Sequence, residues 1–144
     1  MKLLIMLMVI ISCNVLAQPI TRYKMSNSIG PIQNLNRVDV EKDAGKVKVS
    51  FISDSYKEYM VFDDVLSSNT AFNTLDYIRR YSSKDIDIDI KIGGITSAGN
   101  TYMYSYIENG TMSICTVYRA KCVLMSRIHA REFIKSIQDK ISKL

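Results

Sequence analysis

The sequence contains no tryptophan, and its 144 residues include a single histidine, His129. Zinc sites and catalytic triads both draw on histidine, and no cysteine is spaced to join this one, so neither kind of site is indicated. The chain also lacks a Gly-x-Ser-x-Gly turn, a phosphate-binding glycine loop and a His-Glu-x-x-His motif. The sequence therefore does not favour an enzyme, and we expect no cofactor.

Long hydrophobic runs are also missing. The longest spans at most residues 3–17 and is interrupted at residues 12–14, whereas a membrane-spanning helix needs about 20 apolar residues. Lys2 precedes this run and Ala17 ends it, which is typical of a signal peptide cleaved between Ala17 and Gln18. Residues 1–17 therefore predict export to the periplasm or the extracellular medium.

Cysteine is scarce, and the first of its three copies offers a second interpretation of the N-terminus. Ile10, Ile11 and Ser12 precede Cys13 in the apolar, apolar, small order that bacterial lipidation enzymes recognise. Against this, the lipidated chain would begin with an apolar stretch where lipoproteins usually carry a polar tether. The alternative location is a lipid anchor through Cys13.

The other two cysteines, Cys115 and Cys122, invite a disulfide, because an exported chain meets an oxidising environment. One continuous strand, which we expect here, would separate them by about 23 Å and point them to opposite faces. A bridge requires a turn within residues 116–121, which contain no strong turn-forming residue, although residues 119–121 are polar enough to allow one. The sequence leaves both outcomes open.

Proline (two copies) is too rare, and apolar residues (47%) are too common, for a disordered chain. Removing 17 of the 144 residues leaves 127, which is enough for one domain with its own core. Residues 18–36 are polar and aperiodic, and we predict an irregular N-terminal arm there. Residues 37–144 are predicted to form a single α+β domain.

Apolar spacings of two kinds follow one another along this domain. Alternation is clearest in Asp85–Ile92, where four isoleucines alternate with charged residues and are expected to face a core. The Asn-Gly pair at 109–110 predicts a two-residue hairpin turn that places Ile107 opposite Met112 and Tyr104 opposite Cys115. We expect strands near 38–40, 47–51, 57–62, 85–92, 101–108 and 112–125, and helices capped within 67–70 and at Ser126.

This order, βββα-βββα, predicts an α+β fold. It consists of an antiparallel sheet of about six strands with two helices packed on one face.

Three tyrosines on one strand face, Tyr102, Tyr104 and Tyr106, are the candidate ligand-binding residues. They would form a stacking platform for sugar rings or bases, or they would lie half in the core with their hydroxyls at its rim. The opposite face carries Met103 and Ile107, so it has an equal claim to the core.

Three acids at alternate positions, Asp85, Asp87 and Asp89, lie about 7 Å apart along one strand. Carboxylates suit a hard cation, but the intervening isoleucines hold the backbone extended, so the three cannot converge as in a calcium loop. We interpret them as a solvated face that discourages aggregation, and we expect no metal.

The chain has a net charge of +5, concentrated in residues 119–144, where seven basic residues stand against two acidic ones. This predicts weak contact of the basic C-terminal helix with anionic surfaces, although a solvated helix face explains the same charges. An exported protein has little occasion to meet nucleic acid, so none is expected as a partner.

Three hypotheses for function follow. The first is a small exported, non-catalytic module that binds a protein or a small ligand. The second is a hydrolase whose scattered carboxylates are Glu58 with Asp63 or Asp64. The third is a secreted inhibitor that acts by strand addition along the hairpin of residues 101–125.

Overall fold

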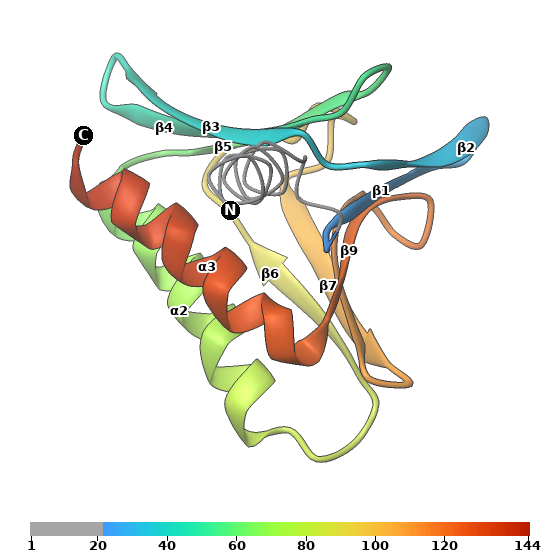
Figure 1. Ribbon diagram of the computed structural model, residues 1–144. Helices are drawn as coiled ribbons and strands as arrows, with labels where there is room; N and C mark the ends of the chain where they lie inside the picture. Colours follow the sequence, from blue (N-terminus) through green and yellow to red (C-terminus); the bar gives the residue numbers. More distant parts are fainter. Residues whose placement is uncertain (1–21) are drawn as a thin grey trace, which may run out of the picture.

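The computed structural model describes residues 22–144, so the predicted signal peptide, its expected cleavage site and Cys13 lie outside the described residues. The described chain has nine strands in two sheets and two helices (Figure 1). One antiparallel sheet has six strands, ordered β2 (Gly30–Asn34), β1 (Lys24–Asn27), β9 (Lys121–Ser126), β8 (Thr111–Val117), β7 (Tyr102–Glu108) and β6 (Ile86–Lys91). The other sheet has three strands, ordered β3 (Arg37–Asp43), β4 (Lys46–Ile52) and β5 (Lys57–Phe62). The helices are α2 (Val65–Tyr81) and α3 (Arg127–Ser142).

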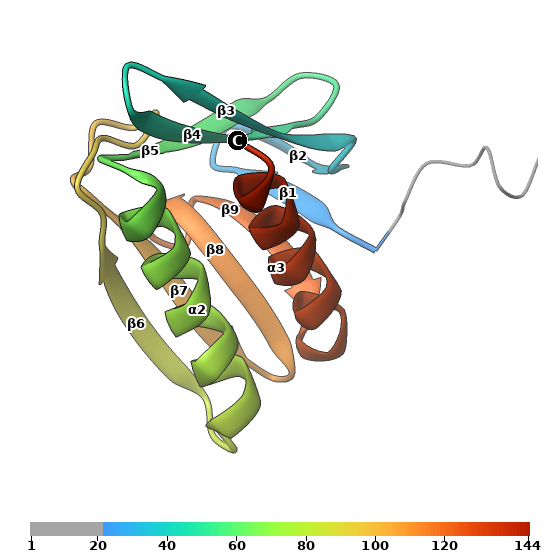
Figure 2. The same cartoon turned by 90° about the vertical axis from the view of Figure 1, so that its left-hand side faces the viewer.

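The predicted α+β class, with a six-stranded antiparallel sheet and two helices on one face, is confirmed. Figure 2 shows α2 and α3 side by side in front of the six-stranded sheet, with the three-stranded sheet across one end of both. The membership of the large sheet differs from the expected one, because the first three expected strands form the separate small sheet and β1, β2 and β9 take their place.

The hydrophobic core lies where the two sheets and the two helices meet. Phe72 from α2 packs on Phe62 at 5.8 Å between ring centroids, and Phe133 from α3 packs on Phe51 at 6.0 Å. Met103 reaches the same core from β7 and is fully buried. Each such side chain contributes about 1.5–3 kcal/mol by leaving water. Neither helix of residues 22–144 is both long and apolar enough to cross a membrane.

Both helices begin at a capping side chain. Ser126 caps α3, as predicted, by accepting a hydrogen bond from His129 N at 3.2 Å. The expected cap of α2 within residues 67–70 is wrong: the helix starts earlier, because Asp64 accepts from Ser67 N at 2.7 Å. Inside the helix, Thr70 Oγ1 instead donates to Leu66 O. One face of α3 is apolar and buried from Ala130 to Ile141.

The predicted irregular arm over residues 18–36 is corrected by the structure, which has β1 and β2 there. Met25 is buried and pairs with Val123 on β9 and with Gln33 on β2. Strands of four and five residues show no periodicity of their own; here β1 is held extended by pairing with β9, and β2 by pairing with β1. Tyr56 Oη also donates to Pro31 O at 3.0 Å, which fixes β2 to the small sheet.

The expected uninterrupted strand to Met125 is also wrong. β8 ends at Val117, a turn occupies residues 118–120, and β9 returns from Lys121. Arg119 adopts φ +56° in this turn, a conformation that costs little for glycine and more for arginine. No glycine, proline or asparagine marks the turn, so its signal is absent from the sequence.

Candidate functional site

The three predicted tyrosines lie on the face of the six-stranded sheet that points away from the helices. Met103 and Ile107 are buried on the helix side of β7, which identifies the core face that the sequence left open. The register follows the predicted turn, with Ile107 opposite Met112 and Tyr104 opposite Cys115. We call the side of the sheet that carries Tyr102, Tyr104 and Tyr106 the outer face.

The tyrosines form a contiguous aromatic cluster. The Tyr102 and Tyr104 rings lie edge to face at 4.8 Å, and the Tyr118 ring packs 5.2 Å from Tyr104 and 6.1 Å from Tyr106. Tyr104 Oη donates to Tyr102 Oη at 2.8 Å, and this hydrogen bond raises the pKa of Tyr104 to about 12. The planes of these rings are therefore inclined to one another, and the rings do not form one flat surface.

Arg119 lies over this cluster from the β8–β9 turn. Its guanidinium is 4.4 Å from the centre of the Tyr106 ring, close enough for a cation–π contact. Its Nε donates to Tyr118 Oη at 3.0 Å, and its other nitrogens pair with Glu108 at 2.9 Å and Asp87 at 3.6 Å. The hydrogen bond to Tyr118, followed by that to Glu108, raises the pKa of Arg119. The turn is thus held down on the outer face.

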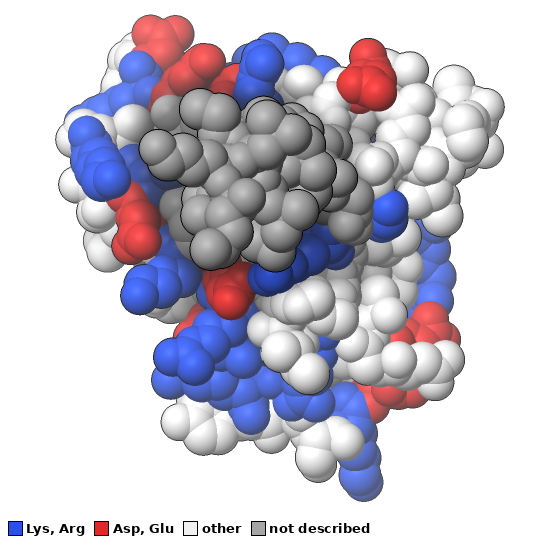
Figure 3. All heavy atoms as spheres, in the orientation of Figure 1, with Lys and Arg blue, Asp and Glu red and all other residues white. Residues whose placement is uncertain are grey.

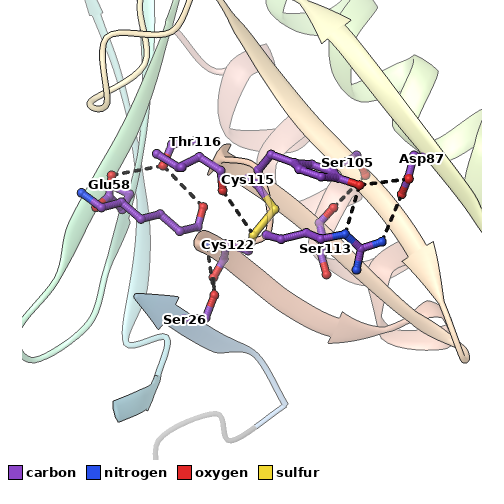
Figure 4. The surroundings of a disulfide bond; sticks show 12 residues. Ser26, Glu58, Asp87, Ser105, Ser113, Cys115, Thr116 and Cys122 are labelled. Atoms are coloured by element: carbon purple, nitrogen blue, oxygen red, sulfur yellow. Dashed lines mark hydrogen bonds and ion pairs between the residues drawn. A yellow bond between two sulfur atoms is a disulfide. The ribbon is translucent and has the colours of Figure 1, made fainter. Parts of the chain in front are cut away.

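A disulfide closes the base of this turn (Figure 4). Cys115 and Cys122 are direct partners across β8 and β9, with Cα atoms 4.0 Å apart, and both are buried. The disulfide that the sequence left open is therefore present, and the turn at residues 118–120 places its two cysteines opposite each other. Ser113 lies opposite Tyr106 and is fully buried, and its hydroxyl has no hydrogen-bond partner within residues 22–144.

A small hollow opens beside the cluster at the β6 side of the outer face. It has a volume of about 220 Å³ and is lined by Tyr104, Tyr118, Asp87, Asp89 and Ile88. Two aromatic rings and two carboxylates around one hollow suit a cation, through ring-face attraction and charge pairing together. Tyr118 Oη donates to Asp87 at 3.0 Å, whereas Asp89 forms no hydrogen bond or ion pair with another described residue.

The row of three acids on β6 and just before it does not converge on one point. Asp85 accepts a hydrogen bond from Asn109 N at 3.2 Å, and Asp87 is engaged by Tyr118 and Arg119. Within residues 22–144, no group of three or more histidine, cysteine or acidic side chains has the geometry to hold a metal ion.

The carboxylates of the hydrolase hypothesis are not brought together by the fold. Glu58 lies in the seam between the two sheets, where its carboxylate accepts from Ser97 Oγ and from Thr116 Oγ1. Asp63 and Asp64 lie at the other end of β5, about 17 Å away by strand rise. Asp64 caps α2, and the backbone hydrogen bond from Ser67 lowers its pKa.

Strand addition along the hairpin of residues 101–125 is excluded by the order of the sheet. β7, β8 and β9 are all internal, because β6 pairs with β7 and β1 pairs with β9. The edges of this sheet within the described chain are β6 and β2.

The basic surface lies over the helices, as Figure 3 shows by the lysine and arginine side chains gathered there. A cleft of about 580 Å³ between α2 and α3 is lined by Arg79, Arg80, Arg131 and Lys135 together with two acids. One of these acids, Asp76, pairs with both Arg79 and Arg80 at 2.8 Å. Asp76 thus compensates part of the positive charge, and weak contact with anionic surfaces stays a prediction.

No family model, curated protein or solved structure matches this chain, so a function has to be argued from its own residues. Sequence reasoning found Tyr102, Tyr104 and Tyr106 but missed Tyr118 and Arg119, because it placed them in a continuous strand. It also read the β6 acids only as a solvated face. The alternation in Asp85–Ile92 could have indicated their role, because it places the acids on the side of the strand opposite to the isoleucines. In the structure this is the side that carries the tyrosines.

Proposed function

We propose that the protein is an exported, non-catalytic binding module that recognises a cationic group on the outer face of its large sheet. The observation that carries this proposal is the convergence of Tyr104, Tyr118, Asp87 and Asp89 on one hollow of about 220 Å³. Ligand pockets for whole small molecules are usually about 300–1,000 Å³, so this one suits a single amine or guanidinium head group.

Three features support recognition of a cation over an uncharged ring. Arg119 already lies on Tyr106, so the same cluster demonstrates the contact within its own chain. The Tyr102 ring is edge-on to Tyr104, which leaves no flat surface for a sugar to stack on both. Asp89 is exposed at the hollow and has no cationic partner among the described residues.

Export is the second part of the proposal. A disulfide at Cys115–Cys122 is consistent with an oxidising compartment, and residues 1–17 have the pattern of a signal peptide. Intact-mass measurement of protein recovered from its native envelope or medium tests the processing of residues 1–17. A mass starting at Gln18 is expected, a diacylglycerol adduct on Cys13 would establish the alternative lipid anchor, and an uncleaved chain would contradict processing by either route.

The cation site is tested with a small probe, Nα-acetyl-lysine methylamide, titrated into the mature protein and followed by tyrosine fluorescence and amide NMR shifts. Its uncharged analogue, Nα-acetyl-norleucine methylamide, is the control ligand. Binding should weaken about fivefold in Asp89→Asn and in Tyr104→Leu. Tyr77→Leu, at an exposed tyrosine on α2, should bind as the parent does. Equal binding of the norleucine analogue would refute the proposal.

A further inference from the structure

The edge strand β6 is the second notable feature beside the hollow. Within residues 22–144 it pairs only with β7, so one row of its backbone N–H and C=O groups has no partner strand (Figure 2). Its six residues, Ile86–Lys91, contain neither proline nor glycine. The opposite edge, β2, contains Gly30 and Pro31, and proline lacks the N–H group that a partner strand would need. Of these two edges, β6 is the one suited to accept a further strand.

Side chains on the two sides of β6 differ in chemistry. Asp87, Asp89 and Lys91 project on the outer face with the tyrosines, because they lie opposite Tyr106, Tyr104 and Tyr102 in the register. The isoleucines project on the helix side, and their exposure rises along the strand, from 7% at Ile90 to 36% at Ile86. Of the four isoleucines predicted to face a core, Ile90 and Ile92 are buried in it, whereas Ile86 lies at its margin.

The helix side of this edge carries a groove. Between β6 and the first half of α2 there is a space of about 470 Å³, lined by the apolar residues Ile88, Ile90, Leu66 and Ala71 and, at its edges, by polar and charged residues that include Asp89 and Lys91. Leu66 is 74% exposed at its rim. The hydroxyl of Thr70, which also lines it, already donates to Leu66 O within the helix. Apolar side chains of an added strand would find room and apolar contact there.

These two sides define one kind of partner. Side chains of an added strand alternate between the faces, and directly opposite residues lie about 5 Å apart at their Cβ atoms. Those on the outer face would lie beside Asp87 and Asp89 and reach the hollow, where basic side chains fit. Those on the other face would enter the groove, where apolar side chains fit. A second copy of β6 is a poorer fit, because it offers one basic side chain, Lys91, against two aspartates.

We propose that β6 accepts an extended peptide segment with alternating basic and apolar side chains, which joins the large sheet as a seventh strand. The proposal rests on the cation site described above, since one basic side chain of the segment would occupy the hollow. It moves strand addition from the internal hairpin, where the sheet order excludes it, to an edge whose outer face carries Asp87 and Asp89, with Lys91 at its end.

The test uses the mature protein and acetyl-Lys-Val-Lys-Val-Lys-Val-Lys-amide as the probe. Binding is measured by calorimetry, and hydrogen exchange is measured at the amides of residues 86–91. Three control peptides separate the contributions: one with glutamate for each lysine, one with the same residues in a lysine block and a valine block, and one with alternate backbone nitrogens methylated. We expect tight binding and slowed hydrogen exchange at β6 only with the alternating lysine-valine peptide, and with none of the three control peptides.

Two charge-reversal variants supply matched controls in the protein. Asp89→Lys should weaken binding at least about tenfold, because it replaces attraction by repulsion beside the hollow. Asp43→Lys makes the same change in net charge at an exposed residue at the end of β3 and should leave binding within about twofold. Leu66→Ser tests the groove separately and should weaken the parent peptide without affecting the single-lysine probe.

The outcomes distinguish the two proposals. If the block or methylated peptide binds as well as the alternating one, strand addition is wrong while the cation site stands. If the single-lysine probe does not bind but the alternating peptide binds and slows hydrogen exchange at β6, the proposed cation site is wrong while strand addition at β6 stands. If Asp89→Lys and Asp43→Lys lose the same amount of peptide affinity, the affinity depends on net charge alone, and both proposals are wrong.

Discussion

Arg119 lies with its guanidinium 4.4 Å above the ring of Tyr106, although it belongs to a turn between two other strands. This contact and the ion pair to Glu108 hold residues 118–120 against the outer face. The turn also brings Tyr118 to the hollow that it lines with Tyr104. A single turn conformation therefore determines the shape of the candidate binding site.

The backbone of Arg119 can be separated from its side chain by two substitutions. Arg119→Ala removes the guanidinium contacts and keeps the positive φ, whereas Arg119→Gly removes the same contacts and relaxes the backbone. Both variants should unfold at lower urea concentration than the parent, with the glycine variant more stable than the alanine variant. Identical urea midpoints for the two variants would mean that the φ of +56° costs nothing.

The disulfide should stabilise the domain by restricting the unfolded chain. A loop of about eight residues corresponds to ~2.5 kcal/mol in the chain-entropy description. Replacing both Cys115 and Cys122 by alanine should lower the free energy of unfolding by about that amount, as measured by urea denaturation. Reductant should lower the stability of the parent similarly and leave the double variant unchanged. A parent protein indifferent to reductant would show that the turn is held by Arg119 and its partners alone.

Elements with a strong local signal were predictable from the sequence. The Asn-Gly turn fixed the β7–β8 register, and Ser126 with the apolar stripe of α3 located the last helix. β1 and β2 could not be found in this way, because β1 is held extended by pairing with β9, about a hundred residues away in the chain, and β2 by pairing with β1. Local spacing does not report such long-range pairing.

The candidate site was only half predictable for the same reason. Alternation placed Tyr102, Tyr104 and Tyr106 together, since residues two apart on a strand share a face. Tyr118 and Arg119 join them through a turn whose central residue takes a conformation that arginine rarely adopts. No residue pattern signals this turn, and the disulfide across β8 and β9 secures it instead.

Glu58 is expected to join the two sheets. Its carboxylate, nearly buried, accepts from Thr116 Oγ1 at 3.2 Å and lies 3.7 Å from Lys121 Nζ. Glu58→Ala should lower the free energy of unfolding by about 2 kcal/mol, because the buried hydroxyl of Thr116 and the partly buried hydroxyl of Ser97 lose the carboxylate as acceptor. Glu58→Gln keeps an acceptor and should cost less. Chemical denaturation of both variants measures the difference, and an alanine variant as stable as the parent would contradict the assigned role.

The pKa of Tyr104 predicts a specific alkaline transition. Its hydroxyl donates to Tyr102, and ionisation would break this hydrogen bond. The bond therefore raises the pKa of Tyr104 from 10.0 to about 12 in the folded protein. Because the folded pKa exceeds the unfolded one, this contribution to stability is fully present below pH 10 and disappears as the pH rises towards 12. Absorbance titration of tyrosinate should show a late-titrating group in the parent protein. That group should be absent from Tyr104→Phe and should titrate earlier in Tyr102→Phe, whereas Tyr77→Phe on α2 should leave it in place. A late group that survives in Tyr104→Phe would place the hydrogen-bonded proton elsewhere in the cluster.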